Sequence, residues 1–377
     1  MKPLRIGFVS PFPPIKGGIA RFSGLLRDAL PSEGYELLPL SFRKLYPDFL
    51  SKGAAEGPPL SSEGGLVLFN PFSWLRAIGS IRAAKPDIIL FSYWTGLLAP
   101  LCWLIRRIAG VRVVVLLHNL SAHDPFFFEP LMTRLLARSA DAYLTLSGAV
   151  SKELASEIPQ SRMLQLFHPP YGPAGEGDTP SRAEARRALG LDEAAPVLLF
   201  YGYVRRYKGL ELLLRAMAEL LRREPSLKLL VAGEFHEDIG RYRRLIMKLD
   251  LAGSVELRPG YVSAEESARL FAATDAVVLP YRRATQSGVA ELAYACGVPV
   301  IVTPVGSLAD AVQHGVTGWV APVASPEGIS AAVEEFLESR SRLPAIRLAI
   351  AEYRRACSWE AFALEAGRFL ETEARRK

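Results

Sequence analysis

Short apolar runs alternate with helical patterns along nearly all of this 377-residue chain, and this alternation limits its fold more than any other feature. The runs are continuously apolar, which is typical of strands in a parallel sheet that is covered on both faces. Strand–helix alternation on this scale predicts repeated βαβ units. In the first half the predicted strands are RIGFVS (5–10), YELLPLS (35–41), DIILFS (87–92), VRVVVLLH (111–118), AYLTLS (142–147) and RMLQLF (162–167).

The pattern restarts after a turn-rich linker, HPPYGPAGEGDTP (168–180), which holds four prolines and three glycines. The chain therefore predicts an α/β protein of two doubly wound parallel sheets, with domains at 1–168 and 190–354. Such sheets bind ligands at the carboxyl ends of their strands, so two facing sheets would form a cleft. The predicted strands of the second half are PVLLFYG (196–202), LKLLVAGE (227–234), VELRPGYV (255–262), AVVLPY (276–281) and PVIVTP (299–304).

The charge of the chain is unevenly distributed. Residues 1–170 hold 18 Lys and Arg against 12 Asp and Glu, and the remainder holds 45 − 18 = 27 against 39 − 12 = 27. A membrane surface or a charged acceptor would explain this excess, and chance solvated charge is the alternative. No basic run or aromatic–basic motif occurs, so no nucleic-acid partner is expected. The unclustered Cys102, Cys296 and Cys357 predict buried small side chains in a reducing compartment.

One uncharged stretch of 18 residues, IILFSYWTGLLAPLCWLI (88–105), is long enough to span a membrane. The break at Thr95 and Gly96, and the following Arg106 and Arg107, instead favour a strand and an amphipathic helix. The opening MKPLRIGFVSPFPP has too short an apolar core for a signal peptide. We therefore expect a cytoplasmic protein.

Two loops that follow predicted strands carry groups suited to a phosphate. In SPFPPIKGGIARFSG (10–24), Gly17 and Gly18 would let a ligand approach the backbone at a helix amino end. In GYVRRYKGLELL (202–213), Arg205 and Lys208 precede a predicted helix, where cations and free amides together favour a phosphate or diphosphate. A flexible turn and a solvated loop cation are the respective structural alternatives.

Two further junctions hold candidate ligand groups. YRRATQSGVAE (281–291) leads into a helix predicted to begin near Ser287 or Gly288, with Glu291 about one turn inside. A carboxylate there can accept both vicinal hydroxyls of a ribose, and a glutamate favoured by the helix dipole is the alternative. His118 ends a buried strand, where it either faces the cleft or is a satisfied structural residue. Because the sequence contains no Asp-x-Asp pair, P-loop or Cys/His cluster, no metal site is expected.

As a set, these motifs resemble glycosyltransferase family 4 (group 1). The resemblance covers about residues 5–370, and it implies a GT-B fold of two facing Rossmann-like domains with the final helix (355–377) packed back on the first. It also implies a retaining, metal-independent hexosyltransferase that uses a nucleotide-sugar donor and no further cofactor. The stretches that carry it are the proline-rich first loop with Gly-Gly, FYGYVRRYKGLELLLRAM, LKLLVAGE, DAVVLPYRRATQSGVAELAYACGVPVIVTPVGSLADAVQHGVTGWVAP and SWEAF.

The resemblance also assigns roles by position. The sequence departs from the family eight residues before Glu291, where Arg283 replaces a usual glutamate, and Gln286 replaces a usual glycine. We expect Gln286 and the amides of Ser287 and Gly288 to substitute for those groups beside the transferred sugar. The implied residues are Arg205 and Lys208 for the donor phosphates, Glu291 for the ribose, Gly17 and Gly18 for the diphosphate and acceptor, and His118 for the transferred sugar.

The expected function is transfer of a sugar to a glycan or lipid-linked acceptor in cell-envelope or polysaccharide synthesis. Two alternatives stay open, a GT-B epimerase or phosphorylase and a non-catalytic binding relative. The positive first half and NPFSWLRAIGSIR (70–82) favour a lipid-linked or anionic acceptor at the inner membrane face, with peripheral contact to anionic lipid. A soluble cytosolic acceptor is the alternative.

Overall fold

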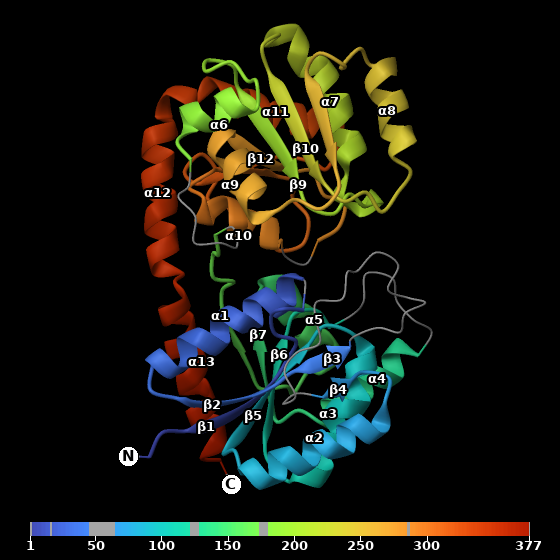
Figure 1. Ribbon diagram of the computed structural model, residues 1–377, viewed down its shortest axis with the longest axis vertical. Helices are drawn as coiled ribbons and strands as arrows, with labels where there is room; N and C mark the ends of the chain where they lie inside the picture. The colour runs from blue at the N-terminus through green and yellow to red at the C-terminus, as the bar shows by residue number, and fades with distance from the viewer. Residues whose placement is uncertain are drawn as a thin grey trace. The chain divides into compact units, whose positions relative to one another are not determined.

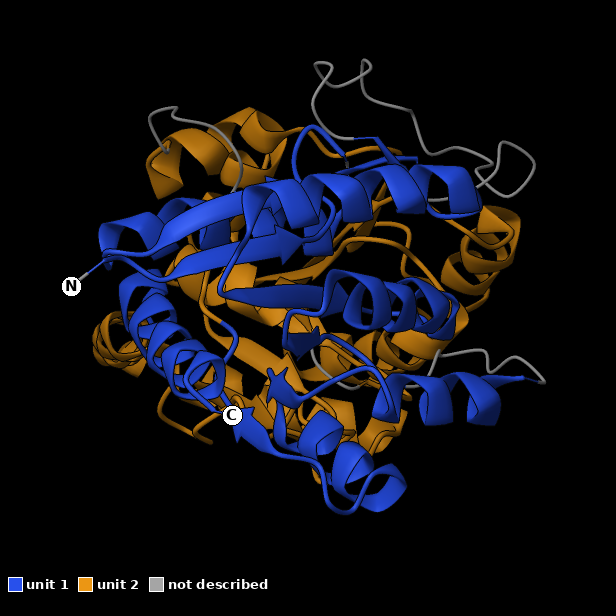
Figure 2. Cartoon of the chain, turned by 90° about the horizontal axis from the view of Figure 1, so that it is seen from below, with its two compact units in different colours: residues 1–168, 358–377 blue, residues 169–357 orange. Residues whose placement is uncertain are grey.

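The chain forms two compact α/β units (Figure 1). Unit 1 comprises residues 1–168 and 358–377, and unit 2 comprises residues 169–357 (Figure 2). Each unit is built on a six-stranded, all-parallel sheet, so the predicted pair of doubly wound sheets is confirmed. The structure is a computed structural model that describes residues 2–15, 17–44, 65–120, 128–172, 180–284 and 287–376.

Unit 1 has the strand order β2-β1-β5-β6-β7-β8. Its elements are β1 (Arg5–Val9), α1 (Gly18–Ser32), β2 (Glu36–Leu40), β3 (Phe42–Lys44), β4 (Leu66–Val67), α2 (Pro71–Ala84), β5 (Ile88–Tyr93), η1 (Gly96–Leu98), α3 (Ala99–Ala109), β6 (Val113–Leu117), α4 (Glu129–Ala137), β7 (Ala142–Thr145), α5 (Gly148–Glu157), β8 (Met163–Gln165) and α13 (Trp359–Ala374). Successive strand residues enter different cores: Ile88 and Leu90 pack with α1 and α13, whereas Ile89 and Phe91 pack with α2 and α3. Burial on both faces explains why the strand sequences are apolar throughout.

Unit 2 has the strand order β11-β10-β9-β12-β13-β14. Its elements are α6 (Arg182–Ala188), β9 (Val197–Tyr201), η2 (Arg206–Lys208), α7 (Leu210–Arg223), β10 (Lys228–Gly233), α8 (Ile239–Lys248), β11 (Val255–Pro259), α9 (Ala264–Ala273), β12 (Ala276–Leu279), α10 (Gly288–Ala295), β13 (Val300–Val302), β14 (Gly318–Val320), α11 (Pro326–Glu338), η3 (Arg340–Arg342) and α12 (Leu343–Ala356). One core unites these strands with the apolar face of α7, where Leu213, Leu214, Met217 and Leu220 are fully buried. Strand β14 was not among the predicted strands, because its three residues, GWV, are too short to show a pattern.

The uncharged stretch 88–105 is divided between β5, η1 and α3, as its break at Thr95 and Gly96 predicts. Arg107 is exposed on α3, while Leu101 and Ile105 on the same helix are buried, which is the predicted amphipathic arrangement. Within the described ranges, no helix is both long and apolar enough to cross a membrane.

The strand order gives each sheet one point where the winding direction reverses, and a crevice is expected there. In unit 1 the chain winds outward from β1 in one direction and from β5 in the other, and in unit 2 the corresponding pair is β9 and β12. The loops after such a pair leave in opposite directions and open a crevice at the carboxyl ends of the strands, where ligands of doubly wound sheets bind. The two crevices are therefore where candidate residues should be sought.

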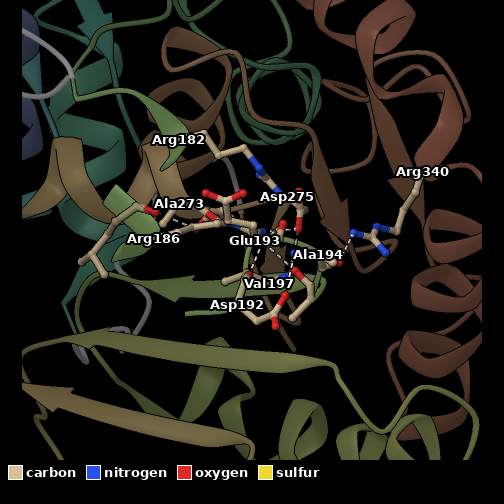
Figure 3. Close-up of polar contacts among 12 residues, drawn as sticks. Arg182, Arg186, Asp192, Glu193, Ala194, Val197, Ala273, Asp275 and Arg340 are labelled. Atoms are coloured by element: carbon tan, nitrogen blue, oxygen red, sulfur yellow. Dashed lines mark hydrogen bonds and ion pairs between the residues drawn. The ribbon is translucent and has the colours of Figure 1, made fainter. Parts of the chain in front are cut away.

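At the amino ends of the unit 2 strands, a buried arginine of α6 bonds the segments that lead into β9 and β12 (Figure 3). The Arg186 guanidinium donates to the carbonyl oxygens of Asp192, Glu193, Ala195 and Ala273, at 2.7–3.0 Å, and to the Asp275 carboxylate at 2.8 Å. That carboxylate also accepts the first amide of β9 at 2.9 Å. The network fixes the amino ends of the two strands that border the crevice.

Helix α13 completes the core of unit 1. Its Phe362, Ala366 and Leu370 are fully buried against α1 and the sheet. Its Glu373 is also fully buried, and its carboxylate forms ion pairs with Arg112 at 3.1 Å and Arg162 at 2.8 Å. Both arginines immediately precede strands, so α13 is tied to the amino edge of the sheet by charge as well as by apolar contact.

Candidate functional site

The turn after β9 carries Lys208 into the crevice of unit 2. Lys208 ends η2, and Gly209 connects η2 to α7 with a φ of 69°, a left-handed conformation that favours glycine. A Cβ at Gly209 would lie 1.9 Å from the carbonyl oxygen of Pro280, which follows β12. Only glycine permits this approach, so the YKG sequence determines how closely the β9 loop can approach the end of β12.

The Lys208 side chain is buried against an aromatic ring. It is 7% exposed, and its ammonium lies 5.4 Å from the centroid of the Tyr281 ring, a cation–π contact. Burial lowers the pKa of Lys208; the nearby Tyr207 partly opposes this shift, and Arg205 adds to it. Among the described residues, no hydrogen bond or ion pair joins the ammonium to another side chain. Because burying an unpaired cation is costly, this position favours a bound anion.

The first turn of α10 borders the same space. A Cβ built on Gly202 would lie 3.5 Å from the Lys208 Nζ and 3.6 Å from Val289 Cγ2, so the ammonium and the start of α10 flank Gly202. The N-cap residue Ser287 does not cap the helix with its side chain, and its Oγ lies 3.3 Å from the Tyr281 hydroxyl. The first amides of α10 thus have no side-chain cap, and a helix amino end attracts anions.

Glu291 is a buried carboxyl group one turn inside α10. It is 5% exposed, and its Oε2 has no hydrogen-bond partner within the part of the chain that the structure describes. Burial raises the pKa of Glu291 to about 8. An unsatisfied buried acceptor needs donors, and vicinal hydroxyl groups of a ligand would supply two.

Some of the predicted site residues of unit 2 lie at the carboxyl ends of its central strands, and others are exposed. Lys208, Ser287 and Gly288 lie around the carboxyl ends of β9 and β12, with Glu291 on the same helix. Arg205 and Arg283 are exposed, although the Arg205 carbonyl accepts the Lys208 amide at 2.9 Å. The remaining predicted residue, Gln286, lies outside the described residues.

In unit 1, the glycine turn lies at the amino end of α1. Gly17 is the N-cap residue with a φ of 136°, and no side chain caps the helix. A Cβ on Gly17 or Gly18 would meet nothing within 4 Å among the described residues, so the backbone of this turn is open to a ligand. Helix α1 is held beside the crevice by Ser23, whose hydroxyl lies 2.5 Å from that of Ser10, which in turn donates to Ser92 at 2.9 Å.

His118 follows β6 and packs against α1. Its ring contacts Phe22 edge to face, with centroids 5.2 Å apart, and its side chain is almost fully buried. Burial, together with the nearby His168, lowers the pKa of His118 to about 3, so the imidazole is neutral at pH 7. Its Nε2 has no hydrogen-bond partner among the residues described, so this atom can still bond a ligand. Phe22 also contacts His168 at 5.1 Å and Trp359 at 4.9 Å, so it connects α1, the linker and the start of α13.

Sequence reasoning missed the groups that support these residues. The sequence predicts Tyr281 only as the end of a strand, although its ring lies beneath the Lys208 ammonium. The three hydroxyls of Ser10, Ser23 and Ser92 were also missed, and the available signal was a serine at the ends of two adjacent strands. In the described ranges, His, Cys, Asp and Glu side chains form no group of three or more that could hold a metal ion.

Comparison with known proteins matches both halves of the chain to family models. Residues 181–356 match the glycosyl transferases group 1 family, and residues 17–166 match the glycosyl transferase 4-like domain. The chain is 31% identical over 313 residues to a D-inositol 3-phosphate glycosyltransferase of Segniliparus rotundus. The alignment covers 77% of this chain and 67% of that relative.

Solved structures show the same fold across the whole chain. A sucrose-phosphate synthase of Thermosynechococcus elongatus superposes with a TM-score of 0.74 at 19% identity, covering 98% of each chain. HepE of Anabaena, solved in complex with UDP and glucose, superposes with a TM-score of 0.74 at 17% identity, covering 98% of this chain and all of the other. Both units therefore take part in the likeness, as the GT-B expectation requires.

Proposed function

This chain belongs to the group 1 glycosyltransferases, and on that premise we propose that it transfers a sugar, with retention of configuration, from a nucleotide-sugar donor to a glycan or lipid-linked acceptor. The observation that carries the donor assignment is a pair of buried groups in unit 2 that lack a hydrogen-bond or ion-pair partner among the described residues, the Lys208 ammonium and the Glu291 Oε2. One calls for an anion and the other for hydroxyl donors. A nucleoside diphosphate offers both, and the solved HepE structure contains UDP.

The proposed mechanism relies on stabilising the leaving group. As the bond between the sugar's anomeric carbon and the diphosphate breaks, negative charge develops on the phosphate oxygens. Lys208 and the first amides of α10 are oriented before the reaction and would stabilise that charge, with Arg205 as an exposed additional cation. The acceptor hydroxyl oxygen forms the new bond on the same face of the sugar, and its proton passes to a phosphate oxygen of the departing diphosphate. No side-chain base is needed in this scheme.

His118 and the Gly17–Gly18 turn are proposed to serve the sugar and acceptor side. His118 is neutral at pH 7, so its unpartnered Nε2 can make a hydrogen bond to a sugar hydroxyl without adding charge. The open backbone at Gly17 and Gly18 fits an approach by the acceptor or the donor diphosphate. The relative named for D-inositol 3-phosphate suggests that a phosphate-bearing acceptor should be tested beside neutral glycans, which agrees with the excess of positive charge in residues 1–170.

The test is nucleotide release from a panel of UDP-, GDP- and ADP-sugars, each with and without candidate acceptors. We expect acceptor-dependent release from at least one donor, and Lys208→Ala should reduce it by roughly 10²-fold, the usual cost of losing one electrostatic donor. Lys228→Ala is the matched control, because Lys228 bonds only an exposed carbonyl of Gly253. Interconversion of the donor without an acceptor would indicate an epimerase, a requirement for free phosphate would indicate a phosphorylase, and no turnover with any donor would refute the enzymatic proposal.

We further propose that unit 1 contacts anionic membrane lipid through α2 and α3. On α2, Phe72 is 83% and Leu75 is 52% exposed, and Arg76 and Arg82 are exposed on the same helix. No acidic residue occurs from 65 to 86, and α3, which packs on α2, adds an exposed Trp103. Exposed aromatic side chains flanked by arginines are typical of helices that lie on an anionic bilayer surface.

Co-sedimentation with vesicles tests this contact. The protein should bind phosphatidylcholine vesicles that contain phosphatidylglycerol, bind less without it, and lose binding in Phe72→Ser/Leu75→Ser. Leu348→Ser, at a leucine of unit 2 that is similarly exposed, is the control and should bind as the parent does. Equal binding to both vesicle types, or no binding at all, would refute the proposal and leave a non-membrane acceptor.

A further inference from the structure

The linker contributes a tyrosine to the head of α10. Tyr171 is half-buried, belongs to unit 2 and follows Pro169 and Pro170. A Cβ built on Gly288 would lie 2.5 Å from the Tyr171 hydroxyl oxygen and 3.6 Å from the ring atom that bears it. The hydroxyl end of the side chain therefore contacts the first residue of the helix, and a methyl group at Gly288 would displace it.

Other residues of the same helix start are close to polar groups as well. The Ser287 Oγ lies 3.3 Å from the Tyr281 hydroxyl, and Val289 flanks Gly202 together with the Lys208 ammonium. The two prolines before Tyr171 fix their own φ angles and so limit the conformations available to this segment. Tyr171 is thus held by a restricted backbone at a point where an anion bound by the first amides would be within reach of its hydroxyl.

We infer that Tyr171 is a further diphosphate-binding residue, whose hydroxyl donates to a phosphate oxygen held at the amino end of α10. The inference rests on the proposed function, because it concerns the same donor site. A hydrogen bond to a charged oxygen is stronger than one between neutral groups, so a single hydroxyl has a measurable effect on affinity. Gly288 is then required for space, since any larger residue would push the hydroxyl away from the amides.

Calorimetric titration of a nucleoside diphosphate and its nucleoside separates a phosphate contact from a structural role. The probes are UDP, GDP and ADP, with uridine, guanosine and adenosine, and the pair that the parent protein binds most tightly is used. Tyr171→Phe should weaken diphosphate binding by about 10- to 100-fold, the range for a hydrogen bond to a charged group, and leave nucleoside binding unchanged. Tyr242→Phe is the control, because it removes a hydroxyl of α8 that donates to Glu237 at 2.9 Å.

Each outcome decides the matter. Diphosphate affinity equal to the parent's in Tyr171→Phe overturns the inference and leaves the proposed function standing. An equal loss for diphosphate and nucleoside also overturns it, because it means that α10, with its Glu291, has shifted. A parent protein that binds none of the three diphosphates refutes the proposed function itself.

A second set of variants tests the geometry without any ligand. Gly288→Ala should lower the midpoint of thermal unfolding slightly, because its methyl would meet the Tyr171 hydroxyl, which is the far end of a side chain and can shift. Removing that hydroxyl in Tyr171→Phe/Gly288→Ala leaves the ring atom 3.6 Å away, an ordinary contact, and should restore the midpoint. Additive losses in the double variant would show that the two residues do not touch, and the inference would fail.

Discussion

Glu291 should release a proton when a nucleotide binds. In the free protein its pKa is raised to about 8, so at pH 7 the carboxyl group is about nine-tenths protonated. Ribose hydroxyls donate best to the ionised carboxylate, so binding favours the deprotonated form and lowers the pKa. The part of the released proton that depends on Glu291 is a signal of the proposed ribose contact.

The magnitude follows from the shift. If the bound-state pKa lies near or below its ordinary value, about 0.9 proton leaves per nucleotide at pH 7 and about 0.5 at pH 8. Because only the ionised form of Glu291 binds ribose well, the affinity for the nucleotide should rise with pH up to about 8 and then become constant. The ionised fraction of Glu291 grows from about one-eleventh to one-half between pH 7 and 8, so its contribution to affinity grows about fivefold.

Calorimetry in buffers of different ionisation enthalpy measures the protons released. Other groups at the site, Lys208 among them, also titrate, so the quantity to compare is the parent minus Glu291→Gln. That difference should be about 0.9 proton at pH 7. Glu338→Gln, which changes an exposed glutamate on α11, is the control, and it should release as many protons as the parent. Equal proton release from the parent and Glu291→Gln, with nucleotide binding intact in both, would refute the reasoning that Glu291 receives the ribose.

Two substitutions test the framework of the unit 2 crevice by thermal and denaturant unfolding. Gly209→Ala should destabilise unit 2 by about 3 kcal/mol or more, because its Cβ would lie 1.9 Å from a backbone carbonyl oxygen at a φ of 69°. Gly253→Ala is the control and should have little effect, because its Cβ would meet nothing within 4 Å. Similar losses of stability in both variants would contradict the argument. Arg186→Met should cost about 3–5 kcal/mol by removing five hydrogen bonds and weakening the pairing of the buried Asp275, whereas Arg187→Met, at the exposed neighbour, should be nearly neutral. A stable Arg186→Met protein would mean that the network contributes little.

Much of the fold is predictable because each strand is buried on both faces. A run such as VVVLL in β6 can hardly be exposed on either side, so strand positions follow from the sequence alone. The helix that carries Glu291 was placed equally well, since small residues precede a helical pattern. The order of strands within each sheet did not follow from the sequence, because it depends on which loops cross over rather than on local composition.

The environment of the site residues was not predictable. The sequence predicts Lys208 as a phosphate-binding cation in a loop, but it gives no sign that the side chain is buried over the ring of Tyr281, 73 residues later in the sequence. Arg186 lies in a charged segment, ARRALG, that gives no indication that its first arginine is buried and its second exposed. The contact between Tyr171 and Gly288 likewise joins a linker to a helix start, and only the three-dimensional structure brings them together.

Unit 1 is discontinuous in sequence, and this has a consequence for synthesis of the protein. On the ribosome, the first 168 residues emerge well before α13, which supplies Phe362, Ala366 and Leu370 to their core. Until residues 358–374 have left the exit tunnel, that core has apolar surface open to water and Arg112 and Arg162 lack the Glu373 carboxylate. Unit 2 is contiguous and emerges entirely before α13 does. Unit 2 can therefore complete its folding before unit 1, whose incomplete core would be recognised by chaperones in the meantime.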